Sequence, residues 1–461
     1  MPPTGWVTGA VKNLSLKTLG PVGIELPGYP ERFHGSILVN DLWFHLDDRM
    51  TALDTEVLII GAGQAGLGLS YYLSRSGIDH QIIDKGRLGN AWRAERWDSF
   101  CLVTPNWSIQ LPGAIYDGDD PDGFMSRDDF VAYMEDWARA FGAPLRENIE
   151  ATAVRRMETG FHVSTSTGPI RAGKVVIATA THQRPRRPQL SDLIPRSITQ
   201  IDATQYRNAD LLAEGAVLVV GSGQTGAQIA QEINQAGRRT YLSVGGTGRL
   251  IRRYRGRDCI AWQKDMGMLD RTPDMLEDPA HRFRGDPHVS GKNGGHTLSL
   301  HDFHRDGITL LGRLAGVEGT VLRFYDDLEE NMIQADAYAD AFMASIDRHI
   351  ALSGIAAPSP TPEELSGGPP SDYWNVPSIE AVDLRGAGVT TVIWATGFAF
   401  DFTWIDGVIL DDFGYPVTDR GVTEMPGLYF TGLNWMHKRK SGILYGVDED
   451  AAYLARWIIE G

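Results

Sequence analysis

The stretch EVLIIGAGQAGLGLSYYL occupies residues 56–73 and decides the fold. Its apolar run leads directly into glycines in the spacing G-x-G-x-x-G, at Gly61, Gly63 and Gly66. The pattern predicts a strand, a phosphate-binding turn and a helix. The first glycine allows the tight turn, the second lets a pyrophosphate approach the backbone, and the third lets the helix pack closely on the sheet. Gly77 is placed to cap that helix.

The next strand of this first unit is HQIID, which ends on Asp84, 23 residues after Gly61. A carboxylate at this place accepts hydrogen bonds from the adenosine ribose of an unphosphorylated dinucleotide. A lone G-x-G-x-x-G is weak evidence. With strand, helix, second strand and carboxylate in order, the first unit is a strong prediction of a dinucleotide site.

The same geometry recurs in VLVVGSGQTGAQIAQEI, at residues 217–233. Its glycines are Gly221, Gly223 and Gly226, and the strand that follows, RRTYLSV, ends at Val244 with no acid nearby. The second unit therefore lacks the ribose-binding carboxylate of the first.

Arginines follow the second unit instead. The segment RLIRRYRGR places three guanidinium groups shortly after the strand, those of Arg249, Arg252 and Arg253. A 2′-phosphate is repelled by a carboxylate and pairs bidentately with a guanidinium group. The second unit is therefore predicted to bind NADP, with a solvated basic loop as the alternative for this segment. Two dinucleotides on one chain indicate a relay in which NADPH delivers hydride to a flavin.

The position of the second unit in mid-chain indicates that one domain is inserted into another. The predicted fold class is α/β, with two Rossmann-like dinucleotide-binding domains. The expected division is an N-terminal extension of unknown role over 1–50, an FAD domain over 51–186 and 386–461, and an NADP domain over 187–385.

The composition is that of an ordinary globular protein, with 42% hydrophobic and 22% charged residues in a chain of 461. A net charge of −16 argues against nucleic acid as the main partner, because phosphate binding needs a basic face. No run of about 18 apolar residues predicts a membrane span. The two cysteines, Cys101 and Cys259, form no Cys-x-x-Cys pair and no thiolate metal site. A cytoplasmic enzyme is expected, and a homodimer is left open.

Five further motifs carry a family resemblance. They are GNAWR (89–93), RWDSFCLVTPNW (96–107), VVIATATHQRP (175–185), VIWATGF (392–398) and GLYFTGLNWMHKRKSGILYGVDEDAAYLA (427–455). Together with the paired glycine motifs, they make the chain resemble the class B flavin-dependent monooxygenases over roughly residues 55–461. That group includes flavin-containing monooxygenases, Baeyer–Villiger monooxygenases and N-hydroxylases. The resemblance implies FAD and NADP as cofactors.

The resemblance also implies roles for single residues around the FAD. The ADP half would be held by Gly61, Gly63, Gly66 and Asp84, and its pyrophosphate and ribityl chain would pass Trp92 and Arg93. Asn106 corresponds to an asparagine that reaches the flavin in flavin-containing monooxygenases, which makes it the catalytic candidate.

The two turns ATA (178–180) and ATG (395–397) mark where the chain crosses between the domains. Small residues suit backbone that passes close to a dinucleotide, so Ala178 and Thr396 are expected beside the cofactors. Ser441 and Leu444 precede the last helix and are expected at the pyrimidine end of the flavin, where a helix N-terminus offers amide donors. The alternative is that these two residues pack the helix.

In the chemistry of the family, NADPH reduces FAD, oxygen forms a C4a-hydroperoxyflavin, and one oxygen atom passes to nitrogen, sulfur or carbon of a small molecule. The chain departs from the Baeyer–Villiger motif F-x-G-x-x-x-H. Aligned on Tyr206, those positions hold Arg196, Ile198 and Asp202. N- or S-oxygenation is therefore favoured over Baeyer–Villiger oxidation. The alternatives are a flavin reductase or dehydrogenase without oxygen insertion, a Baeyer–Villiger-type monooxygenase, and a nucleotide-sensing binding protein.

Five histidines fall between positions 281 and 304: His281, His288, His296, His301 and His304. The segment HDFH would bring two of them to one face of a helix. No strong metal-ligand motif such as H-E-x-x-H occurs, so no metal is predicted. Structural histidines are expected, with the alternative that Lys292, His296 or His301 faces NADP or substrate.

Overall fold

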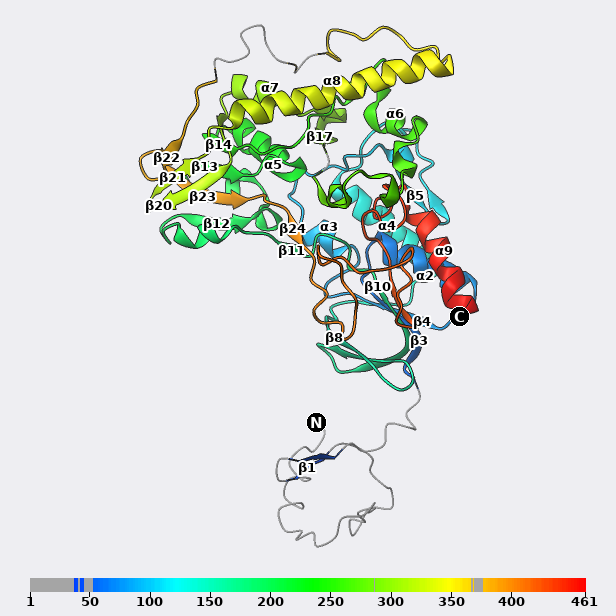
Figure 1. Ribbon diagram of the computed structural model, residues 1–461. Helices are drawn as coiled ribbons and strands as arrows, with labels where there is room; N and C mark the ends of the chain where they lie inside the picture. Colours follow the sequence, from blue (N-terminus) through cyan, green and yellow to red (C-terminus); the bar gives the residue numbers. More distant parts are fainter. Residues whose placement is uncertain (1–36, 40–41, 45–52, 286, 366–367, 369–375) are drawn as a thin grey trace, which may run out of the picture. The chain divides into compact units, whose positions relative to one another are not determined.

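The computed structural model describes residues 37–39, 42–44, 53–285, 287–365, 368 and 376–461 (Figure 1). The chain divides into two compact units, Met1–Leu53 and Asp54–Gly461. In the first unit, strands β1 (Ile37–Val39) and β2 (Leu42–Phe44) pair antiparallel. The other residues of the predicted extension over 1–50 lie outside the described residues.

The first large sheet of the second unit has the strand order β7-β4-β3-β10-β9-β8, with β25 paired to β10. These strands are β3 (Thr55–Ile60), β4 (His80–Ile83), β7 (Leu145–Arg146), β8 (Ala151–Arg156), β9 (Phe161–Thr165), β10 (Ile170–Ile177) and β25 (Leu428–Phe430). Strands β7, β4, β3, β10 and β25 run parallel. Helices α2 (Gln64–Arg75) and α9 (Val447–Glu460) pack against each other, and α2 contacts β3 and β4.

The second large sheet is wholly parallel, with the order β12-β23-β13-β14-β19. Its strands are β12 (Thr199–Asp202), β13 (Ala216–Val220), β14 (Thr240–Ser243), β19 (Thr309–Leu311) and β23 (Val389–Trp394). Helix α5 (Gln224–Gln235) packs on β13 and β14. Strand β13 is buried along its whole length, as parallel strands covered on both faces are.

The remaining elements connect and cover these two sheets. The helices are α3 (Asn90–Ala94), α4 (Arg127–Phe141), α6 (Cys259–Asp265), α7 (Leu300–Arg305) and α8 (Leu328–Ser353). Strands β20 (Leu314–Glu318), β21 (Val321–Phe324) and β22 (Ala381–Asp383) form a small antiparallel sheet. Two-residue strands are β5 (Gln110–Leu111), β6 (Ala114–Ile115), β11 (Arg184–Pro185), β15 (Arg253–Tyr254), β16 (Arg257–Asp258), β17 (Val289–Ser290), β18 (His296–Thr297) and β24 (Phe398–Ala399).

The fold class predicted from the sequence is confirmed: two Rossmann-like sheets lie in one chain, and the segment that builds the second is inserted between β10 and β25 of the first. One predicted boundary is wrong. Strand β23 lies between β12 and β13, so the second domain extends through Trp394 and does not end at 385. The two segments that cross between the sheets lie side by side, because β11 pairs antiparallel with β24.

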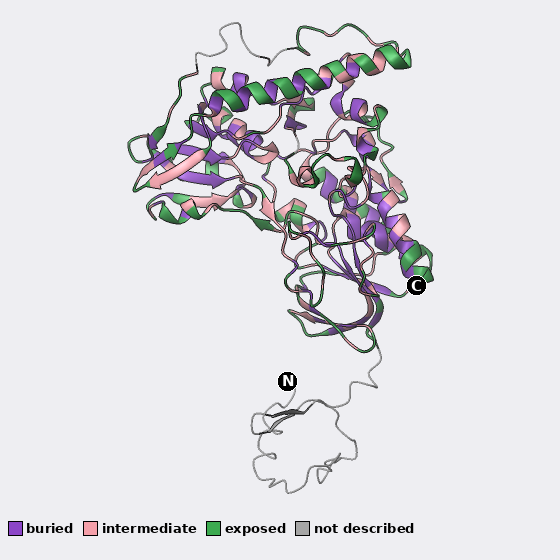
Figure 2. Cartoon of the chain, viewed as in Figure 1, coloured by how far each residue is buried: buried purple, intermediate pink, exposed green. Residues whose placement is uncertain are grey.

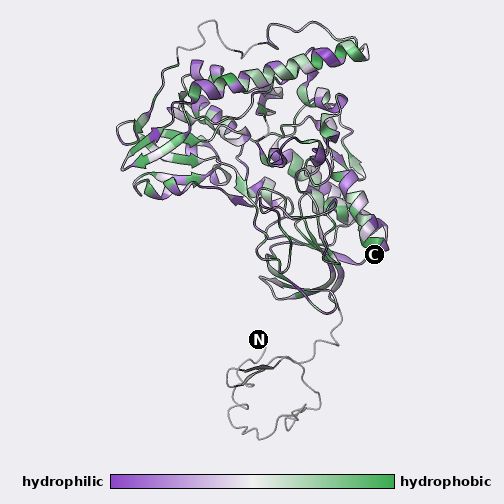
Figure 3. Ribbon diagram, viewed as in Figure 1, coloured by the Kyte–Doolittle hydropathy of each residue, from purple (hydrophilic) through white to green (hydrophobic). Residues whose placement is uncertain are grey.

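The core follows the strands of both sheets. Figure 2 shows the buried residues along these strands, and Figure 3 shows that many residues of the same strands are hydrophobic. In the described part of the chain, no helix is long and apolar enough to cross a lipid bilayer.

Candidate functional site

The first glycine turn joins β3 to α2. A Cβ atom at Gly61, which has a φ of +119°, would lie 2.4 Å from the carbonyl oxygen of Ala178, and one at Gly66 would lie 2.0 Å from the carbonyl oxygen of Gly61. A Cβ at Gly63 would meet nothing within 4 Å. The outer glycines are thus required by backbone packing, and the middle one faces open space. No side chain caps α2, so its first amides are available to a ligand such as a pyrophosphate.

Asp84 directly follows β4 and lies against this first turn. Its Oδ2 accepts a hydrogen bond from the backbone nitrogen of Ala62 at 2.8 Å, and its Oδ1 accepts one from Gly86 at 2.9 Å. The carboxylate is therefore fixed at the end of the second strand, which is the position that a ribose-binding acid takes in dinucleotide-binding folds.

Trp92 and Arg93 lie on α3, close to the first turn. The indole nitrogen of Trp92 donates to Oε1 of Gln64, the first residue of α2, at 3.2 Å. The Arg93 guanidinium pairs with Glu135 and donates from Nε to the Leu88 carbonyl oxygen at 2.8 Å. Contact of either residue with FAD remains a prediction.

The second glycine turn joins β13 to α5 and repeats the geometry of the first. A Cβ at Gly221, with a φ of +106°, would lie 2.5 Å from the Ala395 carbonyl oxygen, and one at Gly226 would lie 1.9 Å from the Gly221 carbonyl oxygen. At Gly223 the nearest atom is Oγ1 of Thr247, at 4.0 Å. The open middle glycine recurs, so this turn also fits a pyrophosphate.

An alanine turn supports each glycine turn. The backbone nitrogen of Ala178 donates to the Ile60 carbonyl oxygen at 2.8 Å, and that of Ala395 donates to the Val220 carbonyl oxygen at 2.9 Å. Ala178 packs under the first glycine turn, and its position beside a cofactor stays a prediction. In the second domain this position belongs to Ala395, whereas the Thr396 hydroxyl donates to the carbonyl oxygen of Arg186 in the crossing segment. Thr396 also lines a cavity of about 520 Å³ there.

Two of the three arginines predicted to bind a 2′-phosphate are neutralised inside the protein. Arg249 is 3% exposed and pairs with Asp336, with Nη2 and Oδ1 separated by 2.9 Å. Arg252 is 2% exposed and pairs with Asp258 at 2.5 Å. That interpretation is corrected for both residues, because their charge is already balanced by carboxylates. Arg253 is exposed, and its guanidinium donates to backbone carbonyls of the loop 294–295.

The loop after β14 is the part of the second domain that sequence reasoning missed. The Ser222 hydroxyl, within the glycine turn, accepts a hydrogen bond from the Gly245 nitrogen at 3.0 Å, and Thr247 lies nearest to Gly223. This loop therefore borders the second cradle at the end of the second strand. The run GGTG after an apolar strand was the sequence signal that could have indicated it.

Asn106, the predicted catalytic residue, is buried and holds a neighbouring loop. Its Nδ2 donates to the Asp120 carbonyl oxygen at 2.9 Å, and its Oδ1 accepts from the Met125 nitrogen at 2.9 Å. Both the nitrogen and the oxygen of the Asn106 amide thus bond to backbone atoms, and the side chain stabilises the loop that contains them. A contact with the flavin stays a prediction.

Ser441 and Leu444 lie before α9, as expected, with side chains directed into the protein. The Ser441 hydroxyl accepts hydrogen bonds from the backbone nitrogens of His437 and Lys438 at 3.2 and 3.1 Å. Leu444 is 5% exposed and belongs to the main hydrophobic cluster. For these two side chains the geometry favours the alternative, packing of the helix.

The first turn of α9 carries the acids Asp448, Glu449 and Asp450. Glu449 is balanced by Lys438 and Lys440, at 2.7 and 2.8 Å. Asp450 is buried, and burial raises its pKa to about 6. The acidic side chains at the start of α9 are therefore either paired with lysines or, at Asp450, buried with a raised pKa.

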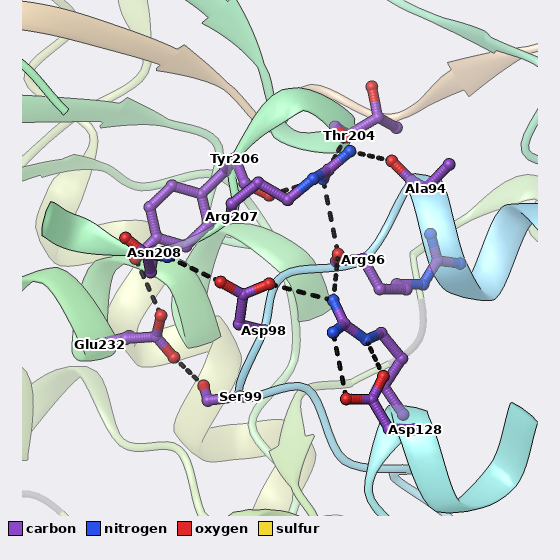
Figure 4. Close-up of polar contacts among 11 residues, drawn as sticks. Ala94, Arg96, Asp98, Ser99, Asp128, Thr204, Tyr206, Arg207, Asn208 and Glu232 are labelled. Carbon is purple, nitrogen blue, oxygen red and sulfur yellow. Dashed lines mark hydrogen bonds and ion pairs between the residues drawn. The ribbon is translucent and has the colours of Figure 1, made fainter. Parts of the chain in front are cut away.

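A polar seam joins the two domains (Figure 4). The segment 94–99 after α3 meets the linker 204–208 and helix α5. Asn208 donates to Oδ2 of Asp98 at 2.7 Å, and Arg207 donates to the carbonyl oxygens of Ala94 and Arg96. These contacts tie a segment of the first domain to the entrance of the second.

Glu232 of α5 is the centre of that seam. It accepts hydrogen bonds from the Tyr206 hydroxyl at 2.9 Å and from the Ser99 hydroxyl (Figure 4), and it pairs with Nζ of Lys292 at 3.3 Å. Lys292 Nζ also donates to the Ser99 hydroxyl at 3.2 Å. Lys292 thus takes part in joining the domains, a role that the sequence did not reveal.

The histidines between positions 281 and 304 do not share one site, and His296 and His301 each bond to a different protein group. HDFH does form a helix, α7, and His301 pairs there with Asp336 at 2.8 Å. His296 contacts Oε1 of Gln231 at 3.0 Å. Within the described ranges, no three His, Cys, Asp or Glu side chains are grouped as metal ligands.

Comparison with known proteins agrees with this two-cradle architecture. Residues 58–255 match the family model described as pyridine nucleotide-disulphide oxidoreductase. The chain is 32% identical over 407 residues to an uncharacterized oxidoreductase, CzcO-like, of Geobacillus kaustophilus (strain HTA426), covering 88% of this chain and 98% of the relative.

Solved structures share the fold. A flavin-containing monooxygenase from Stenotrophomonas maltophilia aligns with a TM-score of 0.57 and 19% identity, covering 88% of this chain and 98% of the other. OTEMO, solved in complex with FAD and NADP, aligns with a TM-score of 0.54 and 16% identity, covering 89% and 86%.

The fold and its paired cradles define a protein with two Rossmann-like dinucleotide-binding domains. Within that class, the chain belongs to the CzcO-like oxidoreductase family. The protein is therefore an oxidoreductase.

Proposed function

We propose that the protein is an NADPH-dependent monooxygenase that transfers one oxygen atom of O2 to a small-molecule substrate, with N- or S-oxygenation favoured. The observation that carries the proposal is the duplicated cradle, in which each glycine turn faces open space at Gly63 or Gly223 and rests on an alanine turn. Two such cradles in one chain suit an enzyme that passes electrons from one dinucleotide to another. The name of the flavin-containing monooxygenase that shares the fold also supports the proposal.

The assignment of FAD to the first cradle is supported by Asp84, which stands where a ribose-binding acid is needed. The second cradle has no acid at the matching position, because β14 is followed by Val244 and then by the run GGTG. A 2′-phosphate would meet no repelling carboxylate there, so this cradle suits NADPH. Of the three arginines considered at first, Arg253 is the remaining candidate for contact with that phosphate.

The preference for N- or S-oxygenation is supported by the linker before the second cradle. Asp202, which stands where Baeyer–Villiger enzymes have histidine, caps the start of the short 3-10 helix Ala203–Gln205 and pairs with Arg187 at 2.6 Å. The position is thus used to build the linker. Bound FAD would supply the transfer of electrons from NADPH to oxygen, and the residues of the chain would bind the cofactors and keep water from the reaction.

The alternative is a flavin reductase or dehydrogenase that passes electrons on without inserting oxygen. Purified protein is assayed for NADPH oxidation, oxygen consumption and hydrogen peroxide over a panel of amines, thioethers and ketones. A monooxygenase consumes NADPH and oxygen in equal amounts and gives an oxygenated product. NADPH oxidation that ends only in hydrogen peroxide or in a reduced dye, with no oxygenated product from any class, would support the reductase instead.

A further inference from the structure

A cavity of about 520 Å³ lies where the chain crosses between the two domains. Its volume falls within the range of small-molecule sites, about 300–1,000 Å³. Both crossing segments line it, and we call it the arginine recess after three of its lining residues. The residues that line the recess are Arg184, Pro185, Arg186, Arg187, Pro188, Thr396 and Ala399. None of these lining residues is acidic, so the recess favours an anion over a cation.

The walls of the recess are held by paired backbone. Arg184 lies opposite Ala399 in the antiparallel pair β11–β24 (Figure 1). The backbone nitrogen of Arg186 donates to the Gly397 carbonyl oxygen at 2.9 Å, and the Thr396 hydroxyl donates to the Arg186 carbonyl oxygen. A proline stands on either side of the pair Arg186–Arg187 and restricts its own φ angle. The guanidinium groups therefore extend from a fixed frame.

Two of the three guanidinium groups have a carboxylate neighbour and still have donors to spare. Nη1 of Arg184 lies 3.2 Å from Oδ2 of Asp401, and Nε of Arg187 donates to Oδ1 of Asp202 at 2.6 Å. Each contact engages one nitrogen, whereas a guanidinium group has five N–H donors. The side chains of Arg184 and Arg187 are 67% and 34% exposed, and ion pairs this open to water are weak. A ligand can therefore share both groups with their carboxylates.

Arg186 supplies the uncompensated charge of the recess. It is exposed, and in the described part of the chain its guanidinium has no carboxylate within ion-pair distance. The two ion pairs on either side cancel their own charges, so Arg186 leaves a local excess of one positive charge in a chain whose net charge is −16. An anion that enters the recess gains a full attraction there.

The number and type of the donors indicate the anion. A single carboxylate has two oxygens and is matched by one guanidinium group, whereas a phosphate or pyrophosphate group has enough oxygens to accept from several groups at once. Arginine is suited to this role because its planar fork binds phosphate oxygens in pairs. Three arginines around one recess therefore fit a phosphate better than a carboxylate.

We propose that the arginine recess binds the phosphate or pyrophosphate group of a small molecule. The site is separate from both glycine turns, and the inference does not depend on whether the protein inserts oxygen. The phosphate belongs either to a free phosphorylated compound or to the nicotinamide dinucleotide. Because Thr396 follows Ala395, which packs under the second glycine turn, a ligand in the recess would contact the chain next to the second cradle.

The test is calorimetric titration of the full-length protein with inorganic pyrophosphate and, separately, with NADP+, at constant ionic strength. Arg186→Gln is expected to weaken pyrophosphate binding by roughly fivefold or more, because it removes the charge-assisted hydrogen bonds of the unpaired guanidinium. Asp401→Asn should have the opposite sign and strengthen binding, because it removes a negative charge and releases Arg184. Loss of pyrophosphate affinity alone in Arg186→Gln assigns a free phosphorylated compound, and loss of both affinities assigns the dinucleotide.

The matched control is Arg196→Gln. Arg196 is also exposed and, among the described residues, also has no carboxylate within ion-pair distance, but it does not line the recess. Its replacement changes the net charge equally and should leave both affinities unchanged. Pyrophosphate binding that is the same in Arg186→Gln and the wild type would overturn the proposal, and so would an equal loss in Arg196→Gln. Both glycine turns stay intact in these variants, and no turnover is measured, so failure of this test would leave the proposed monooxygenase activity untouched.

Discussion

At the scale of single residues, the middle glycines of the two cradles are the sharpest test of cofactor placement. A Cβ at Gly63 meets no atom within 4 Å, and one at Gly223 meets only Thr247 at that limit. A variant with alanine at either place should therefore fold normally, and the added methyl group should interfere only with ligand binding. The neighbouring glycines differ, because a Cβ at Gly66 or Gly226 would collide with backbone.

We expect Gly63→Ala to be purified with less FAD and an unchanged melting temperature of the flavin-free protein. Gly223→Ala should retain FAD and bind NADP+ at least several-fold more weakly. Flavin content and NADP+ titration measure the two effects. Gly226→Ala is the control for a clash, and it should lower stability. If Gly63→Ala lost NADP+ affinity and kept its FAD, the assignment of the two cradles would have to be exchanged.

The arginines after β14 allow a second prediction at this scale. Arg253→Ala should weaken the binding of NADPH more than that of NADH, because only NADPH carries a 2′-phosphate. Arg249→Ala should instead cost about 3–5 kcal/mol of stability, because it leaves Asp336 buried and less compensated. Michaelis constants for the two nucleotides and denaturant unfolding separate the effects. An equal loss of NADPH and NADH in Arg253→Ala would count against the phosphate contact.

At the scale of elements, the sequence predicted the local units well. The glycine spacing and the apolar runs predicted a helix after each glycine turn, and α2 and α5 lie there. These signals are local, so the sequence contains them. The strand β23 was assigned to the wrong domain because its partners β12 and β13 lie far away in the chain. The ion pair between Arg249 and Asp336 of α8 could not be predicted for the same reason, because the two residues are 87 positions apart in the chain.

The first turn of α9 gives a pH prediction. Burial raises the pKa of Asp450 from 3.8 to about 6, so the folded protein holds this proton more tightly than the unfolded chain does. The stability that this adds is complete below about pH 4 and is lost as the pH rises through 6. Asp450→Asn, which keeps the shape, should remove that loss and raise the melting temperature at pH 7–8 relative to the wild type.

The control for this change is Asp448→Asn on the exposed side of the same turn. It removes one acid from the helix end without removing a buried one. If Asp450→Asn and the wild type showed parallel melting temperatures from pH 4 to pH 8, the buried carboxyl would not be the source of the pH dependence.

At the scale of the whole molecule, the seam around Glu232 determines how the cradles face each other. The side chains of Tyr206, Ser99 and Lys292 converge on it from the linker, the first domain and the loop after the second cradle. We expect Glu232→Gln to slow reduction of bound FAD by NADPH severalfold, because hydride transfer depends on distance and alignment. Affinity for NADP+ should change little.

Stopped-flow absorbance of the flavin measures that rate. Asp302→Asn, which breaks an exposed pair with Arg305, is the control for loss of an ordinary surface ion pair and should leave the rate unchanged. Equal reduction rates in wild type and Glu232→Gln would show that the seam has no part in alignment.

The candidate site was less predictable than the fold, because many of its contacts join residues that are far apart in the sequence. The sequence identified the cradles, because glycines and their neighbours are contiguous. It could not show that Asn106 is used by the loop 120–125 or that Ser441 is used by the turn before α9, because side-chain partners follow from packing.

The alanine turns under the glycine turns have one more implication. One follows β10 and the other follows β23, and each begins a segment that crosses to the other domain; the two crossing segments are paired through β11 and β24. A nucleotide bound at one glycine turn would lie close to the bend through which the chain leaves for the other domain, because an alanine turn packs under each glycine turn. We therefore expect nucleotide binding at one cradle to alter the conformation of the other cradle through the backbone that connects them.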